Sequence, residues 1–436
     1  MTDAARKAGL LVPLFSCPSS TSWGIGDIGD LVPLTAWLAG AGQRVLQLLP
    51  INEMSPAQHS PYSAISAMAI DPLYIRVPDV PEFAAMGGEA TLTRDERELL
   101  NAARGASRVD YPAVRRLKHS ALRRAFERFF EAEWRADTSR ARDLKAFRNS
   151  QAWWVEDYSL FRAIHAREGE RAWTEWPAAL QRRTPEAIDR VRRELLNEVL
   201  FYQYVQWVAA AQWRAARERT SGVALYGDVA FMVDGDSADV WARQHQFRLD
   251  VSIGAPPDAF SATGQNWGLP LYRWDAIAAE GFLWLRERAR RSADLFDGYR
   301  IDHLVGFYRT FGWPKDGSES FFTPADEATQ TSLGERVLQV FREPGSAIIA
   351  EDLGIVPDFV RASLARLGVP GFRVFRWERH WHDEGQPFRD PGEYPVTSVA
   401  ASGTHDTEPM SIWWAGLSRE EQQKVSALRT VAQMTG

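Results

Sequence analysis

The stretch Phe296-Asp-Gly-Tyr-Arg-Ile-Asp-His303 reads as a short buried strand that ends in an acidic side chain. Similar short apolar runs, bounded by turn residues, recur along the chain. The seven predicted strands are Gly9–Phe15, Arg44–Ile51, Ala224–Phe231, Phe296–Asp302, Ala347–Asp352, Phe372–Trp377 and Val399–His405. Helical patterns such as Leu31–Ala41 and Val356–Leu367 alternate with them. Because such alternation produces parallel sheets with right-handed crossovers, the sequence predicts an α/β fold of the TIM (β/α)8-barrel type rather than an open doubly wound sheet.

A long segment, residues 52–222, interrupts the alternation after the second predicted strand. Apolar residues recur there three and four apart, as in Val114–Ala136 and Glu186–Thr220, which predicts a mostly helical inserted subdomain. Residues 1–51 and 223–436 are then expected to form the barrel. The segment is rich in Arg, but interleaved Glu and Asp indicate a solvated, ion-paired surface rather than a nucleic-acid site.

Composition excludes several classes of protein. The 436 residues carry 51 Lys and Arg against 57 Asp and Glu, a net charge of −6, so no basic field would attract nucleic acid or an anionic membrane. No run approaches the ~18 apolar residues of a membrane span. The single cysteine, Cys17, fits a reducing cytosol and a cytoplasmic location. The 18 Trp favour carbohydrate binding only slightly, since most Trp belong to a core.

The glycines Gly24, Gly26 and Gly29 match the G-x-G-x-x-G pattern of dinucleotide-binding turns. In such a turn the first glycine directly follows a strand, whereas here Ser16–Trp23 intervenes. No acidic residue follows about 20 positions later either. We therefore expect a tight loop leading into a helix, and no nucleotide cofactor.

Three acidic residues, Asp302, Glu351 and Asp406, follow the fourth, fifth and seventh predicted strands. Barrel enzymes keep their chemistry at these strand ends. One such acid would often be a helix cap or an ion-pair partner, but three indicate a site. A set of this kind supports glycosyl transfer, in which one carboxylate attacks the anomeric carbon and a protonated one assists the leaving oxygen.

The surroundings of each acid suggest its role. Arg300 lies two residues before Asp302 and so on the same face of the strand, where its charge is expected to lower the pKa of an attacking carboxylate. Glu351 would need a pKa raised by burial or by negative neighbours, as a proton donor does. Asp406 would bind sugar hydroxyls and favour the distorted ring.

Motifs around these acids resemble those of the 4-α-glucanotransferases of the amylomaltase (disproportionating enzyme) family, relatives of the α-amylases. They occur in family order and are Trp23–Asp30, Leu46–Ile51, Ser60–Tyr62, Asp236–Trp241, Pro256–Ser261, Gly264–Tyr272, Arg300–His303, Ala350–Gly354 and Gly403–Asp406.

The resemblance implies a retaining transfer of α-1,4-glucan segments from a donor to the 4-hydroxyl of an acceptor sugar. Asp302 would be the nucleophile, Glu351 the acid/base and Asp406 the transition-state stabiliser. The expected partners are maltooligosaccharides and starch- or glycogen-type glucans, without a cofactor or metal. The substrate-binding residues that the resemblance implies are Ser60, Tyr62, Asp236, Asp258, Gln265, Trp267, Arg300, His303 and His405. Three of these, Asp258, Gln265 and Trp267, are expected on a loop over residues 250–275, after the third predicted strand.

The sequence departs from the family pattern near its end. Thr407 stands where the family usually has Asn, and Leu304-Val305 replaces the more usual Phe-Arg. No eighth strand is recognisable after Asp406, so we expect the last βα unit of the barrel to be missing. A weak or inactive glucan-binding remnant and an α-glucan hydrolase with the same acids are therefore the alternatives.

Overall fold

The computed structural model describes residues 6–55, 58, 60–220, 222–257 and 261–435. Its main sheet has seven parallel strands in the order β1-β2-β3-β6-β9-β10-β11. They are β1 (Gly9–Val12), β2 (Val45–Leu48), β3 (Ala224–Val229), β6 (Gly298–Ile301), β9 (Ala347–Ala350), β10 (Gly371–Val374) and β11 (Ser398–Ala401). Each of the predicted strands is confirmed, and spatial order follows chain order, as in a barrel.

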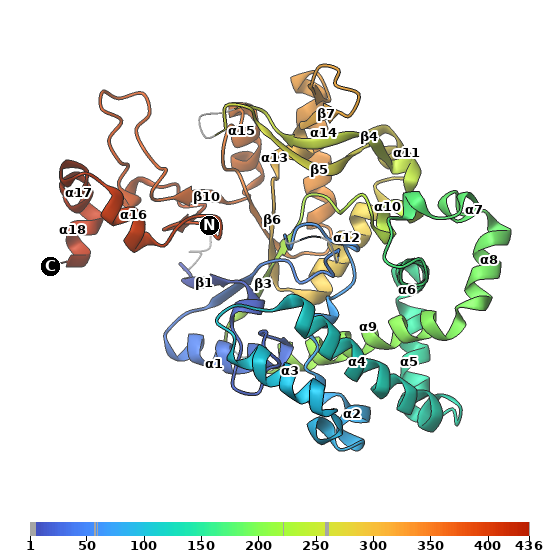
Figure 1. Ribbon diagram of the computed structural model, residues 1–436. Helices are drawn as coiled ribbons and strands as arrows, with labels where there is room; N and C mark the ends of the chain where they lie inside the picture. The colour runs from blue at the N-terminus through green and yellow to red at the C-terminus, as the bar shows by residue number, and fades with distance from the viewer. Residues whose placement is uncertain (1–5, 56–57, 59, 221, 258–260, 436) are drawn as a thin grey trace.

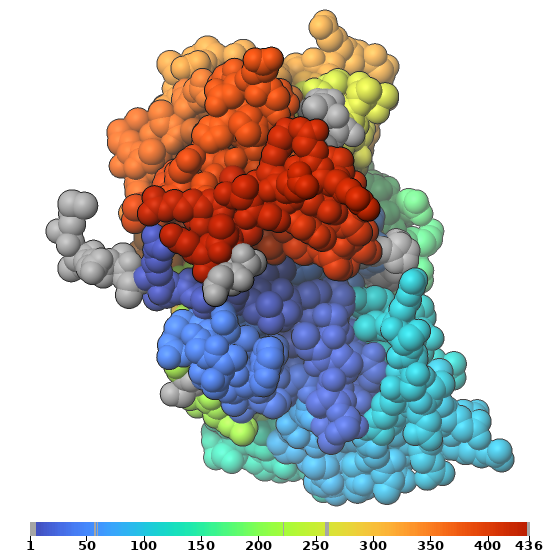
Figure 2. All heavy atoms as spheres, turned by 90° about the vertical axis from the view of Figure 1, so that its left-hand side faces the viewer, coloured from blue at the N-terminus to red at the C-terminus, as the bar shows by residue number. Residues whose placement is uncertain are grey.

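The sheet is curled and open, with β1 and β11 as its outer strands (Figure 1). Every residue of β6 is buried, because helices cover a parallel sheet on its faces. The helices between its strands include α1 (Leu31–Gly40), α12 (Leu283–Leu295), α14 (Glu327–Arg342) and α15 (Asp358–Leu367). After β11 the chain forms α16 (Met410–Gly416), α17 (Arg419–Ser426) and α18 (Arg429–Thr435). On that side of the molecule the C-terminal residues, in red, meet the N-terminal residues, in blue (Figure 2).

A second sheet corrects the expectation of a loop over residues 250–275. Four antiparallel strands pair in the order β5-β4-β7-β8. They are β4 (Phe247–Ala255), β5 (Gln265–Tyr272), β7 (Thr310–Pro314) and β8 (Phe321–Thr323). A Cβ at Gly254 would lie 1.8 Å from the Gln265 carbonyl oxygen, so the β4–β5 pair needs glycine there. Glycine and polar residues in these strands interrupt the alternation of apolar residues, so the sequence pattern did not predict the strands.

Helices dominate the chain between β2 and β3. They are α2 (Pro81–Ala85), α3 (Arg94–Gly105), α4 (Tyr111–Phe129), α5 (Ser139–Ser150), α6 (Ala152–Arg167), α7 (Ala178–Gln181), α8 (Pro185–Glu194) and α9 (Leu196–Arg217). Three shorter helices, α10 (Ala238–Ala242), α11 (Trp274–Ala279) and α13 (Val305–Tyr308), lie further along the chain. One continuous cluster of buried side chains runs from β6, at Ile301, into α6 and α9, at Phe161 and Val205. The helices between β2 and β3 therefore share a core with the parallel sheet.

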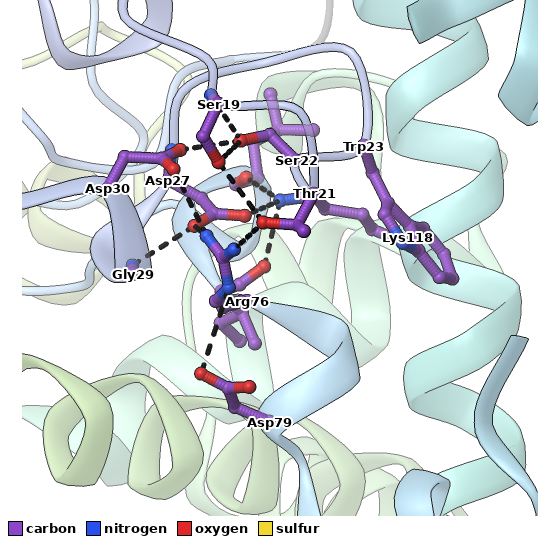
Figure 3. A network of polar contacts seen from close by, with 12 residues as sticks. Ser19, Thr21, Ser22, Trp23, Asp27, Gly29, Asp30, Arg76, Asp79 and Lys118 are labelled. Atoms are coloured by element: carbon purple, nitrogen blue, oxygen red, sulfur yellow. Dashed lines mark hydrogen bonds and ion pairs between the residues drawn. The ribbon is translucent and has the colours of Figure 1, made fainter. Parts of the chain in front are cut away.

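The G-x-G-x-x-G stretch is held by packing and by a network of buried charges. A Cβ at Gly26 would lie 2.0 Å from the Leu14 carbonyl oxygen, and one at Gly29 would lie 2.1 Å from Cδ of Arg76. Arg76 itself contacts the carboxylates of Asp27 and Asp30 at 3.0 and 3.1 Å (Figure 3). These glycines allow close approach of protein groups, which agrees with the expectation of a structural loop.

Within the described part of the chain, no helix combines the length and the apolar character that crossing a membrane requires.

Candidate active site

Sheet register brings the charged residues at the strand ends together. In the β3–β6 pair Asp228 lies opposite Arg300, and in the β6–β9 pair Ile301 lies opposite Ala350. Asp302 and Glu351 are the next residues of those two strands, so they occupy neighbouring positions at the same edge of the sheet. Two of the three predicted catalytic acids are thus adjacent, as the sequence predicts.

Arg300 is the centre of this cluster. Its Nη1 lies 2.8 Å from Oδ1 of Asp302 and 2.7 Å from Oδ2 of Asp228. The predicted pairing of Arg300 with Asp302 is confirmed, but Asp228 was missed. Asp228 lies inside the predicted strand Ala224–Phe231, whose apolar run continues past it. The available signal was the presence of an acid within an apolar strand, because a fully buried carboxylate needs a cation.

Arg300 lowers the pKa of Asp302, as predicted, but burial has the larger effect. Burial raises the pKa of Asp302 to about 7, although Arg300 opposes this rise. Asp228 and Glu351 add to the rise because they place further negative charge beside the same carboxylate. The Arg300 guanidinium interacts with several acids, so it lowers the pKa of each one less than it would lower that of a single partner.

Glu351 is held by backbone groups. Its two carboxylate oxygens accept hydrogen bonds from the N–H groups of His303, at 2.8 Å, and of Leu353, at 2.9 Å. Burial raises the pKa of Glu351 against the opposing charge of Arg300. The direction is the one that a proton donor needs near neutral pH.

Tyr62 joins two strand ends from a loop after β2. Its hydroxyl donates to Oδ2 of Asp228 at 2.8 Å and lies 3.1 Å from Nε2 of His405. The Tyr62 and His405 rings also stack, with centroids 5.7 Å apart and planes at 22°. Burial lowers the pKa of His405, which favours a neutral imidazole at this position. Both residues therefore belong to the Arg300 cluster.

His303 and Trp267 form a second contact beside the acids. The indole meets the imidazole edge-on, with centroids 4.7 Å apart. Nε1 of Trp267 donates to Oε1 of Gln265 at 3.1 Å, so β5 contributes both of these predicted binding residues. Burial lowers the pKa of His303 to about 4, with a smaller contribution from Arg300. His303 is thus a neutral side chain beside Asp302.

Other predicted residues lie further out. The Asp406 side chain is 79% exposed, against 25% for Asp302, and its carboxylate contacts His405 at 3.3 Å. The Ser60 hydroxyl accepts a bond from the Tyr62 N–H at 3.3 Å. Asp258 lies outside the described residues.

Asp236 is in a different environment from the other predicted binding residues. One of its oxygens accepts from the Trp173 N–H at 2.9 Å, and the other lies 3.1 Å from Nε2 of His165. Both partners belong to the helical segment between β2 and β3, so protein groups already occupy both carboxylate oxygens.

The acids do not line the cavity of about 1240 Å³ that lies between α5, α9 and α12. That cavity includes Val223 and Asp297, which directly precede β3 and β6. It therefore lies at the amino ends of the strands, whereas the acids lie at the carboxyl ends, where barrel enzymes carry their active sites.

Comparison with known proteins agrees with this geometry. A sequence model of the family described as 4-alpha-glucanotransferase matches residues 12–435. The 4-alpha-glucanotransferase of Chlamydia pneumoniae is 32% identical over 441 residues, which cover 100% of this chain and 81% of that relative. The 4-alpha-glucanotransferase of Thermus thermophilus is 34% identical over 434 residues, covering 96% and 82%.

A solved structure extends the comparison to three dimensions. The amylomaltase from Streptococcus agalactiae in complex with acarbose superposes with a TM-score of 0.83 at 27% identity, covering 97% of this chain and 84% of that one. The match to the family extends along nearly the whole chain and includes the strands that carry Arg300, Asp302 and Glu351. The chain belongs to the 4-α-glucanotransferase family.

Proposed function

We propose that this 4-α-glucanotransferase moves α-1,4-glucan segments to the 4-hydroxyl of an acceptor glucose or maltooligosaccharide through a covalent glycosyl–Asp302. The observation that carries the proposal is the placement of Asp302 and Glu351 on neighbouring strands, with Arg300 on Asp302. Neighbouring strands lie about 4.8 Å apart. Carboxyl groups about 5–5.5 Å apart are typical of retaining enzymes, and larger separations of inverting ones.

In the first step, a carboxylate oxygen of Asp302 attacks the anomeric carbon of the donor. The glycosidic C–O bond breaks, and Glu351 gives its proton to the departing 4-oxygen. In the second step, the acceptor 4-hydroxyl attacks the same carbon and gives its proton to Glu351. The bond to Asp302 then breaks, so both carboxyl groups return to their first states with the anomeric configuration retained.

The remaining residues would bind and orient the sugar. Arg300 holds Asp302 in place, and neutral His303 can donate to a hydroxyl without adding charge beside the developing positive sugar ring. Tyr62 and His405 offer a polar edge and a stacked aromatic surface. Asp406 is exposed and can turn toward a sugar that occupies the site. Ser60, Asp258, Gln265 and Trp267 would line the path of the glucan chain, whose class is maltooligosaccharides or starch- and glycogen-type polymers.

For the scaffold, we propose a (β/α)8-type barrel formed by residues 1–51 and 223–436, with 52–222 as an inserted helical subdomain. The seven-stranded curled sheet supports this arrangement. A cytoplasmic location is part of the same proposal and rests on the single cysteine, Cys17.

Incubation with maltotriose tests the activity. Transfer produces glucose together with maltotetraose and longer chains, because each turnover joins a donor segment to an acceptor. Hydrolysis would give only glucose and maltose. An unchanged substrate would support the inactive remnant. Separation of the products by chromatography distinguishes these outcomes in one experiment.

A further inference from the structure

We propose that helix α6 positions Tyr62 for catalysis through two buried charged contacts, and that His165 is the positioning residue of the second contact. This inference rests on the proposed function, because Tyr62 belongs to the proposed sugar site. It concerns a part of the chain outside that site. Residues 60–67, which begin just before Tyr62, form the Tyr62 loop.

The first contact holds one side of the Tyr62 loop through Glu53. Nε of Arg162, on α6, lies 3.1 Å from the Glu53 carboxylate, and the Tyr158 hydroxyl donates to the same group. Glu53 in turn pairs with the loop through its backbone, since its carbonyl oxygen accepts from the Ile65 N–H at 2.8 Å. A movement of α6 relative to the sheet would therefore displace Ile65.

The second contact holds the opposite side through Asp236. His165, also on α6, lies 3.1 Å from this carboxylate. The segment 234–239 then binds the loop at several points. The Asp234 N–H donates to the Ala64 carbonyl oxygen at 3.0 Å, and the Ala238 N–H donates to that of Ile65 at 2.8 Å.

A side chain adds a further bond between this segment and the loop. The Ala67 N–H donates to Oδ2 of Asp239 at 2.8 Å. The loop thus lies between Glu53 and the segment 234–239, and α6 contacts both. Tyr62, at the start of the loop, reaches Asp228 and His405 from this support.

Two carboxylates and one guanidinium surround the His165 ring. Its Nδ1 lies 2.8 Å from the Glu170 carboxylate, while Nε2 lies 3.1 Å from that of Asp236. A neutral imidazole has a single N–H, so both nitrogens can donate to these carboxylates only in the imidazolium. Nη1 of Arg162 also lies 3.2 Å from Nδ1 of His165 and donates to Glu170 at 3.2 Å. The side chain is only 2% exposed, and a cation so well buried must be paired.

The charged groups around His165 come from three parts of the chain. Asp236 and Glu170 are the two acids, and Arg162 opposes them from the same helix. Although burial favours the neutral ring, the two acids raise the pKa of His165 above its ordinary value.

A double-mutant cycle between His165 and Tyr62 tests the inference. His165→Gln keeps a hydrogen-bonding side chain but removes the charge, and we expect it to lower kcat/KM for maltotriose about tenfold, mainly through KM. In a Tyr62→Ala background the same substitution should cost less than about twofold, because the residue through which it acts is gone. A purely structural role would give the same loss in both backgrounds.

His245→Gln is the matched control, because His245 also pairs with a carboxylate, that of Glu280, but on the surface. It should leave kcat/KM unchanged. Glu170→Gln is a milder second variant should His165→Gln fail to fold, since Glu170 is 40% exposed and keeps one hydrogen bond. The expected loss for this variant is smaller but follows the same dependence on Tyr62.

Hydrogen exchange of the Ile65 and Ala67 amides gives a readout that does not require activity. Exchange at these amides should be faster in His165→Gln than in the wild type and unchanged in His245→Gln. Unchanged exchange at both amides, or an equal loss of kcat/KM with and without Tyr62, would overturn the inference. An inactive wild type would instead refute the proposed function and leave the exchange experiment as the test of positioning.

Discussion

The cluster around Arg300 and the cluster around Arg76 each join several carboxylates to one guanidinium, yet they balance charge differently. Beside Arg76, the Lys118 ammonium lies 3.6 Å from Asp27 and supplies a second cation (Figure 3). The two buried acids of that cluster, Asp27 and Asp30, are thus matched by two cations, and its third acid, Asp79, is 64% exposed to water. Arg300 faces Asp228 and Asp302 while Glu351 adds its charge nearby.

Hydrogen bonding differs in the same way. Oδ2 of Asp30 accepts from the Ser22 hydroxyl at 2.7 Å and from the Asp27 N–H at 2.9 Å. Such bonding fixes the loop that precedes α1. Asp302 instead keeps a partly exposed carboxylate. A balanced, saturated cluster stabilises the fold, whereas an excess of acid keeps a proton available for chemistry.

We expect the largest loss of activity when the attacking oxygen of Asp302 is removed. Asp302→Asn should lower kcat by at least about 10⁴-fold, because the amide cannot form the glycosyl ester. Oligosaccharide binding should remain close to that of the wild type, since Arg300 and Tyr62 stay in place. Maltotriose turnover and isothermal titration with an oligosaccharide measure the two quantities.

Asp30→Asn is the matched substitution in the balanced cluster. It should lower stability but leave the activity of each folded molecule unchanged. Wild-type activity in Asp302→Asn would refute the assignment of the nucleophile, and a comparable loss of kcat in Asp30→Asn would remove the distinction between the clusters.

The guanidinium groups provide a second comparison. Removing one partner of a buried ion pair costs about 3–5 kcal/mol, because it leaves a charge without compensation. We therefore expect both Arg300→Met and Arg76→Met to lower the free energy of unfolding. Only Arg300→Met should also lower kcat/KM, by about 10²-fold or more, since Asp302 loses its orienting contact.

Denaturant unfolding followed by activity measurements on the folded fraction separates these effects. The comparison fails if Arg76→Met loses as much activity per folded molecule as Arg300→Met does. It would also fail if Arg300→Met retained the kcat/KM of the wild type.

The sequence predicted the framework of the site more completely than its electrostatics. Apolar runs bounded by turn residues identified the strands of the parallel sheet, because burial on both faces leaves a continuous apolar signal. The spacing of Arg300 and Asp302, two positions apart on a strand, also predicted that their side chains lie on the same face. The antiparallel sheet depends on pairing between segments far apart in the chain, with bulges that break the alternation, and was missed for that reason.

The environments of Asp228, Asp236 and Asp302 depend on contacts that form only in three dimensions. Asp228 and Asp236 are both acids near the end of β3, yet one faces Arg300 and the other faces His165. Nothing in the spacing distinguishes them, since the choice depends on which helix packs behind the loop. The sign of the Asp302 pKa likewise depends on burial and on acids from two other strands.

The pH dependence of kcat/KM is the smallest and most diagnostic expected effect. Only the ionised form of Asp302 can attack, so activity should rise with pH through the raised pKa of about 7 rather than near the ordinary value of 3.8. Asp228→Asn removes a negative charge beside Asp302 and leaves Asp302 as the ion-pair partner of Arg300. Both changes lower the pKa of Asp302, so the acid limb of the profile should move to lower pH by about one unit.

The control for this shift is Asp30→Asn, whose acid limb should coincide with that of the wild type because Asp30 belongs to the other cluster. An acid limb near 3.8 in the wild type would show that the charge of Arg300 outweighs the burial of Asp302. If the acid limb does not move in Asp228→Asn, then Asp228 does not influence the pKa of Asp302. The pH of the acid limb in the wild type, Asp228→Asn and Asp30→Asn thus measures how strongly Asp228 competes with Asp302 for the charge of Arg300.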